Sequence, residues 1–171
     1  KYKASKSVNS SINTPGKKNA FTLGTLAVET SQYSEDYPAL IVASSVLGGG
    51  FLNSRIADRL RQKDGVSYGA GGAVNVGSSK EDKNSGIFVY AIYAPQNKAK
   101  VQLGFKEEIA RFITDGITEE ELKNAVKGWI QGQTVSRAKD NEISSLINNN
   151  IYYKRDINFQ KNIEEKLSKL T

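Results

Sequence analysis

The chain has 171 residues, of which 38% are apolar and 25% are charged, a composition typical of one globular domain. It contains neither Cys nor His, which excludes disulfides, thiolate metal sites, zinc motifs built on His and a Ser-His-Asp triad. The net charge is +6, but the basic residues are spread along the chain, which favours a solvated surface over a nucleic-acid-binding face.

The chain starts with a polar segment, residues 1–18, which contains a Pro15–Gly16 pair and predicts irregular structure ending in a turn. Residues 19–29, NAFTLGTLAVE, are apolar and β-prone, and they predict a strand. Apolar residues occur at odd and at even positions, so apolar side chains point to both faces of this strand. We therefore expect both of its faces to be at least partly covered.

The next segment, EDYPALIVASSVLGGG, predicts a helix. Ser34 is a candidate cap, Glu35 and Asp36 suit the first turn, and Pro38 is tolerated near a helix start. The three glycines at 48–50 are expected to end this helix. They fit neither of the two common glycine-rich phosphate motifs, so a helix stop is favoured over a phosphate loop.

A second, short helix is predicted in SRIADRLRQ, capped by Asn53 or Ser54 and ended by Gly65. Two strands follow, at 67–76 and 86–94. The polar loop SSKEDKNS separates them, so we expect a hairpin.

The remaining residues predict helices. An amphipathic helix covers 97–115 and is followed by Thr118 and Glu121, which form a capping box for the next helix. Two further helical stretches begin at Asp140 and Asn158. Acidic pairs occur on these helices at Glu107–Glu108 and Glu119–Glu121, and we expect them to be solvated rather than catalytic.

This order of elements predicts an α+β fold, with an antiparallel sheet covered on one face by helices. Residues 1–171 are interpreted as a single domain without repeats or linkers. No apolar run is long enough to span a membrane. Because the sequence starts at Lys1 and contains no Met, we expect it to be a fragment of a larger polypeptide.

Arg61 and Tyr68 are the candidate functional residues, with Gly65 allowing a turn between them. A guanidinium and a phenol that face one cavity can both donate hydrogen bonds to an oxyanion or a peptide carbonyl. The number of residues between Arg61 and Tyr68 does not determine how far apart their side chains lie in the fold, because the two belong to different elements. The residues by themselves favour ordinary packing or surface roles.

The run SSVLGGGFLNSRIADRLRQKDGVSYGAGG resembles the second homology domain of the pitrilysin/insulinase family of zinc metallopeptidases. The flanking runs KKNAFTLGTLAVE and DGITEEELKNAVKGWIQGQ resemble the elements that surround it there. The resemblance extends from about residue 17 to residue 171. It is closest to the bacterial, long-chain, envelope-located members.

The resemblance implies a metallopeptidase-homology fold like that of the mitochondrial processing peptidases, in which several such domains close around a peptide. Zinc would be held by HxxEH and a distal Glu in another domain, with no cofactor in this one. Tyr68 would act catalytically by donating to the scissile carbonyl oxygen, and Arg61 would hold the substrate backbone or support that Tyr. The implied partners are a peptide substrate and the other homology domains, in the bacterial periplasm or cell envelope.

Two alternatives stay open. A structural or scaffolding domain of an inactive homologue would belong to a protein that lacks HxxEH in every domain. A basic nucleic-acid-binding module is the weaker alternative, because the sequence contains no recognisable reading motif, and we expect no nucleic-acid partner. The isolated chain is expected to bind no zinc and to cleave nothing.

Overall fold

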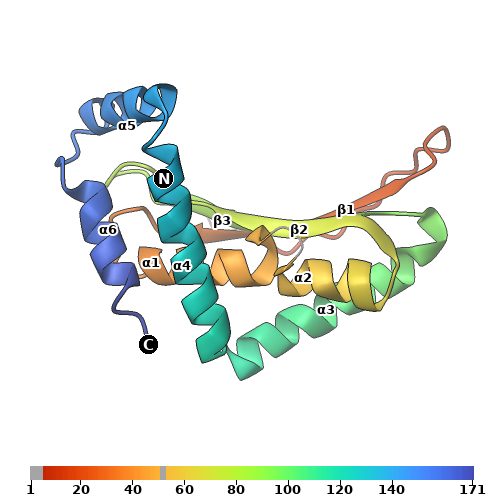
Figure 1. Ribbon diagram of the computed structural model, residues 1–171. Helices are drawn as coiled ribbons and strands as arrows, with labels where there is room; N and C mark the ends of the chain where they lie inside the picture. Colours follow the sequence, from red (N-terminus) through yellow and green to blue (C-terminus); the bar gives the residue numbers. More distant parts are fainter. Residues whose placement is uncertain (1–5, 51–52) are drawn as a thin grey trace.

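The computed structural model describes residues 6–50 and 53–171, and within them it contains one three-stranded antiparallel sheet and six α-helices (Figure 1). Two π-helical turns, η1 and η3, and a short 3-10 helix, η4, complete the fold. The elements run in the order β1 (Ala20–Glu29), α1 (Tyr37–Ser44), η1 (Ser45–Gly49), α2 (Arg55–Ala57), η3 (Asp58–Lys63), β2 (Ser67–Asn75), β3 (Asn84–Tyr93), η4 (Pro95–Asn97), α3 (Lys98–Asp115), α4 (Glu119–Ser136), α5 (Asp140–Tyr152) and α6 (Phe159–Leu167). The α+β prediction is confirmed.

The sheet has the order β1-β3-β2, so the most apolar strand, β3, lies in the centre. β1 pairs with it without a break from Ala20↔Tyr93 to Glu29↔Asn84. β2 and β3 form the predicted hairpin. The helices gather on one face of this sheet, as Figure 1 shows for α1, α2 and α3.

The two faces of the sheet differ sharply in exposure. On the helix-covered face, Val89, Ala91 and Tyr93 are at most 8% exposed. On the opposite face, Phe21 is 60% and Leu23 is 55% exposed. We expected both faces of β1 to be at least partly covered, and the structure leaves Phe21 and Leu23 more than half exposed, because the helices that pack on the sheet lie on its other side.

Two groups of buried side chains form the interior. The first joins the sheet to α2, η3 and α3 and consists of Ile56, Leu60, Val66, Ala70, Val89, Ala91, Tyr93, Val101 and Phe105. The second joins α1 and η1 to α4 and α6 and consists of Val42, Val46, Ala125, Ile163 and Leu167. Leu60 and Val66, which lie next to Arg61 and shortly before Tyr68 in the sequence, belong to the first group, so a packed core supports the candidate segment.

The first helix begins later than the sequence indicates. α1 starts at Tyr37, and its N-cap residue is Asp36, which makes no side-chain capping bond. The Ser34 hydroxyl instead accepts a hydrogen bond from the backbone N–H of Ser31 at 3.0 Å. Ser34 therefore closes a turn between β1 and α1, a local alternative to capping that Ser side chains commonly adopt.

The triple glycine does more than end a helix. The helical path continues through η1 to Gly49, and Gly50 follows it. A Cβ atom at Gly48 would lie 2.3 Å from the backbone nitrogen and 2.6 Å from the Cα of Gly72 on β2. Gly48 is therefore required for the close approach of η1 to the sheet.

One acidic pair differs from expectation. Glu108 is only 3% exposed, and its carboxylate pairs with Arg111 at 2.7 Å. The residue follows Val101 and Phe105 on the face of α3 that packs inward, so the helical spacing buries it. The prediction of a solvated carboxylate at this position was wrong.

Candidate functional site

The turn between Arg61 and Tyr68 is held by buried groups. Leu60, next to Arg61 on η3, is 1% exposed. Its carbonyl accepts a hydrogen bond from the Val66 N–H at 3.0 Å, and the Val66 carbonyl accepts one from Asn97 Nδ2 at 3.2 Å. Gly65 has a φ of +62°, which lets the chain reverse there as predicted.

Tyr68 occupies a β-bulge at the start of β2. Ser67 pairs with Tyr93 and Gly69 pairs with Ile92, so Tyr68 is the extra residue that has no partner on β3. The Ser67 hydroxyl holds this geometry, since its Oγ lies 2.8 Å from the Gly69 carbonyl oxygen and 2.9 Å from that of Ile92. The Tyr68 side chain is 66% exposed. Bulges of this kind re-aim a side chain away from the regular ladder.

Arg61 differs from the other cations of η3. Arg59 forms an ion pair with Asp64 at 2.8 Å, and Lys63 forms one with Asp58 at 2.7 Å. Among residues 6–50 and 53–171, no carboxylate pairs with Arg61. Its guanidinium therefore keeps its donors for another acceptor.

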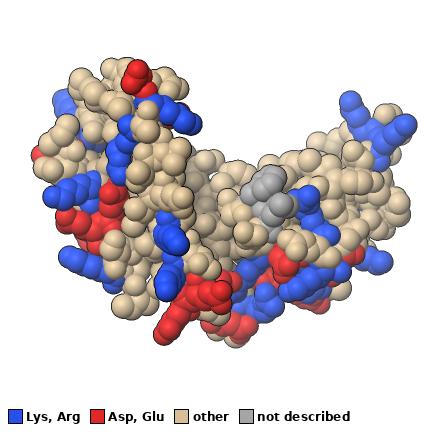
Figure 2. Space-filling view, in the orientation of Figure 1, with Lys and Arg blue, Asp and Glu red and all other residues tan. Residues whose placement is uncertain are grey.

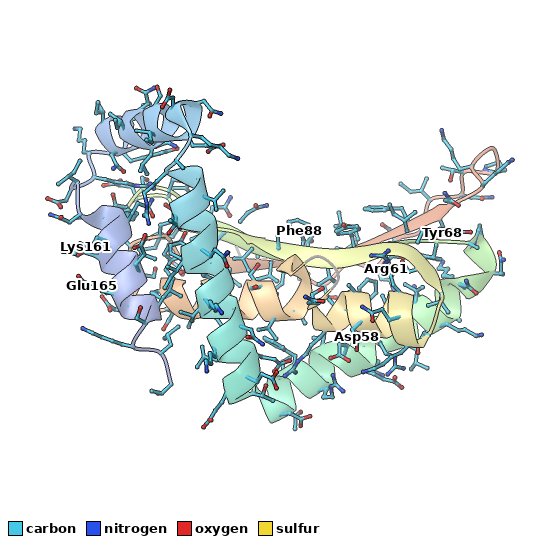
Figure 3. The ribbon with its side chains drawn as sticks, viewed as in Figure 1. Asp58, Arg61, Tyr68, Phe88, Lys161 and Glu165 are labelled. Atoms are coloured by element: carbon cyan, nitrogen blue, oxygen red, sulfur yellow. The ribbon has the colours of Figure 1, made fainter. Side chains whose placement is uncertain are left out.

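Both predicted residues belong to one corner of the fold. η3 packs against β2, and the short turn at Gly65 connects them. Figure 3 shows Arg61 and Tyr68 at the same end of the molecule, with Phe88 farther along the sheet. An exposed phenol and an unpaired guanidinium at one corner can donate hydrogen bonds to a single extended ligand.

The sequence did not reveal the contact by which α2, just before η3, is held to the start of α4. Arg55 donates from Nε and Nη2 to the two carboxylate oxygens of Glu121, each at 2.7 Å, and also to the Gly116 carbonyl at 2.8 Å. Its guanidinium stacks on the Phe112 ring, 5.4 Å from the centroid. The hydrogen bond from Arg55 is the main reason why the pKa of Glu121 is lowered to about 2.

Of the contacts that Glu121 makes, the sequence pattern predicts the capping box but not the ion pair with Arg55. The capping box predicted at Thr118 and Glu121 is present, with the Glu121 N–H donating to Thr118 Oγ1 at 3.2 Å. Arg55 lies 66 positions away from Glu121 along the chain. No local pattern connects the two, because the contact depends on how α2 packs against the start of α4.

The described residues do not fit a metal site. They contain no group of three or more His, Cys, Asp or Glu side chains that could hold an ion. Across the same residues, no helix combines the length and the apolar character that a membrane span requires.

Comparison with solved structures agrees with the fold. The peptidase M16 inactive domain from Pseudomonas fluorescens superposes with a TM-score of 0.76 at 18% identity, covering 91% of this chain and 36% of that one. The periplasmic protease PqqL from Escherichia coli superposes with a TM-score of 0.72 at 13% identity, covering 91% of this chain and 17% of that one. At such identities the likeness is one of fold.

Sequence comparison is more specific. An uncharacterised zinc protease of Mycobacterium leprae is 32% identical over 102 residues, which are 60% of this chain and 22% of that protein. The matched segment thus spans about a fifth of the length of this curated relative. The family described as peptidase M16 inactive domain matches residues 3–128, well over half of the sequence. The resemblance to the zinc metallopeptidases is therefore confirmed, and the chain belongs to the peptidase M16 inactive domain family.

Proposed function

We propose that this chain is a domain that completes the substrate chamber of a zinc endopeptidase. Tyr68 donates a hydrogen bond to the scissile carbonyl oxygen as that oxygen becomes anionic, and Arg61 holds the substrate backbone. One observation carries this proposal. Tyr68 is an exposed phenol on a bulge, and Arg61, on the adjoining helical turn, is a guanidinium without an ion-pair partner among the described residues.

The chemistry of the two groups suits these roles. A phenol offers one O–H donor that is not ionised at neutral pH, and a guanidinium offers five N–H donors in a fixed planar fork. Donors of this kind stabilise a transition state when they point at the position where negative charge develops. The packed turn around Leu60 and Val66 fixes the backbone from which both side chains extend, which helps to hold the donors in place.

The hydrolytic chemistry itself is assigned to another domain. This chain has no His and no Cys, and its described carboxylates do not gather into a metal site. Zinc and the attacking water would therefore come from a different part of a longer polypeptide, and this chain alone cleaves no peptide bond. Both the zinc protease of Mycobacterium leprae and the Pseudomonas fluorescens protein are longer than this chain, which supports this arrangement.

The test is Tyr68→Phe in the full-length enzyme. We expect kcat to fall by about 10- to 1000-fold, the effect of one lost oxyanion donor, with little change in KM. Tyr90→Phe, the same chemical change on the central strand of the sheet, serves as the control and should leave kcat nearly unchanged. A Tyr68→Phe enzyme that folds normally and keeps its kcat contradicts the role of Tyr68.

Arg61→Ala in the same enzyme tests substrate binding. We expect KM to rise with a smaller effect on kcat, because contacts to the substrate backbone are made in the ground state as well as in the transition state. Lys63→Ala removes the same charge from the same helical turn and should leave KM unchanged. Equal effects of the two substitutions would show that only the general charge of η3 matters.

We also propose that the parent enzyme is located in the bacterial cell envelope. The support is the sequence resemblance to envelope-located members together with the shared fold of the periplasmic Escherichia coli protease. Fractionation of cells, followed by detection of the protein in each fraction, tests this location. Recovery in the cytoplasmic fraction alone would contradict it.

A further inference from the structure

A hollow of ≈ 620 Å³ lies at the end of the sheet farthest from Tyr68. Its walls are Tyr33, the loop residues Ser79–Glu81, and Tyr152, Tyr153 and Lys154. In Figure 1 the yellow-green loop between β2 and β3 lies beside α5 and α6. β2 runs from Ser67 to Asn75, so its length separates this hollow from Tyr68 by roughly 25 Å. The two sites are therefore distinct.

Aromatic rings form much of the wall. The rings of Tyr152 and Tyr153 meet edge to face at 4.9 Å, and Lys80 Nζ lies 5.4 Å from the centroid of the Tyr33 ring. Within the part of the chain that the structure describes, none of these three phenol hydroxyls bonds to a protein group. The hollow thus combines planar apolar surfaces with O–H donors that point to no internal partner.

The net charge of the residues that line the hollow is positive. Like most of the described lysines, Lys80 and Lys154 form no ion pair with any described residue, so both ammonium groups remain available to a ligand. Glu81 is the acidic group among the lining residues. Two ammonium groups against one carboxylate leave a net positive hollow, which attracts an anion.

A third cation lies behind the wall. The Arg155 guanidinium stacks on the Tyr153 ring at 4.8 Å, and it donates to the neutral carbonyl oxygen of Ser78 at 2.7 Å. Its Nε is buried and has no partner among the described residues. No described carboxylate neutralises Arg155, so its charge adds to that of the two lysines.

The backbone at Lys154 gives an independent indication. Of the non-glycine residues that the structure describes, Lys154 is the one with a positive φ, +51°. It follows the end of α5, a position where Gly or Asn is the usual residue. This conformation costs a lysine more strain than a glycine, and strain of this kind collects at functional sites, so Lys154 is a candidate binding residue.

We propose that this hollow binds a carboxylate of an acidic peptide segment. Lys80 and Lys154 hold the carboxylate, and the rings of Tyr33, Tyr152 and Tyr153 hold the apolar or aromatic side chain next to it. The size of the positive charge matches one or two carboxylates. A nucleic acid needs a longer basic track, and Figure 2 shows basic and acidic residues mixed over the face in view.

The test is a binding titration of the 171-residue chain with a short peptide, Tyr-Glu-Glu-Phe, blocked at both ends. We expect this peptide to bind and the blocked Tyr-Gln-Gln-Phe to bind at least about tenfold more weakly, as for the loss of a charge-assisted hydrogen bond. The carboxylate can belong to an acidic side chain or to the C-terminus of a peptide, and the glutamine peptide with a free carboxyl end distinguishes these two sources. Recovery of binding by that form assigns the site to a peptide C-terminus, and no recovery assigns it to acidic side chains.

Two variants connect the binding to the hollow. Lys154→Gly should weaken binding of the glutamate peptide by about tenfold while Tm stays the same or rises, because glycine adopts a φ of +51° without strain. Lys80→Ala should weaken it by a similar factor. Lys161→Ala removes an exposed lysine of α6 outside the hollow and should leave the affinity unchanged (Figure 3).

Several results would overturn the proposal. These are no binding of the glutamate peptide, equal binding of the two blocked peptides, or a loss of affinity in Lys161→Ala as large as in Lys154→Gly. Tighter binding of a single-stranded oligonucleotide with the same charge as the glutamate peptide would assign the hollow to nucleic acid instead. None of these measurements involves Arg61 or Tyr68, so the result does not depend on the function proposed above.

Discussion

The ion pair between Arg55 and Glu121 makes a quantitative prediction about stability. Glu121 accepts from two guanidinium nitrogens at 2.7 Å, and it is also the N3 residue of the capping box that begins α4. Glu121→Gln removes the charge but keeps a side chain that can complete the capping box. The substitution therefore isolates the contribution of the ion pair.

The magnitude follows from the pKa of Glu121, which is lowered from 4.5 to about 2, chiefly by the hydrogen bond from Arg55. A shift of that size corresponds to roughly 3 kcal/mol, at about 1.4 kcal/mol for each pKa unit. The Glu121 side chain is 30% exposed, so solvent screens part of the interaction. We expect Glu121→Gln to lower the free energy of unfolding by about 1–2 kcal/mol at neutral pH.

The direction in which the stabilising effect of Glu121 changes with pH also follows from its lowered pKa. Because the pKa of Glu121 is lower in the folded state than in the unfolded state, its stabilising effect is complete above a pH of about 4.5. The effect is lost as the pH falls towards about 2. The difference in stability between the native sequence and Glu121→Gln should therefore shrink across this range.

Urea unfolding followed by circular dichroism, at neutral pH and at several values down to about 2.5, measures this difference. Glu120→Gln is the matched control, because Glu120 lies in the same helical turn, is exposed and has no ion pair among the described residues. It should change stability by less than about 0.5 kcal/mol. The reasoning is refuted if the two substitutions have equal effects at neutral pH, or if the effect of Glu121→Gln stays constant in acid.

Two further predictions concern the folded scaffold. Gly48→Ala should destabilise the domain by roughly 3 kcal/mol, because the new Cβ would lie 2.3 Å from a backbone nitrogen of β2 that cannot move alone. Gly132→Ala on α4, where a Cβ meets nothing within 4 Å, should instead stabilise it by about 0.5–1 kcal/mol, and thermal unfolding that ranks the two variants otherwise contradicts this account. Thr118→Ala should lower the free energy of unfolding by about 1 kcal/mol through loss of the cap. Thr114→Ala on the exposed surface of α3 should leave it unchanged or raise it by about 0.5 kcal/mol in the same urea assay, and a similar loss in both would show that the cap contributes nothing.

The order and kind of the elements followed from local patterns. The hairpin, the capping box at Thr118 and the turn at Gly65 all depend on residues within a few positions of one another. Local chemistry is enough for such features, because the residues that form the contact are close together along the chain. The family resemblance was likewise contained in one continuous run of residues.

Features that join distant segments could not be predicted in this way. Alternation did not show that one face of β1 lies open, and helical surface patterning did not show that Glu108 is buried. The role of Gly48 became visible only with Gly72 beside it.

For the candidate site too, the sequence determined some properties and the tertiary structure determined others. The sequence alone identified Arg61 and Tyr68 as residue types able to donate hydrogen bonds, because donor chemistry belongs to the residue itself. The tertiary structure decided that Tyr68 is the extra residue of a bulge and that Arg61 lacks the carboxylate partner found for Arg59 and Lys63. Exposure and pairing depend on neighbours brought in by packing, so only the folded chain defines them.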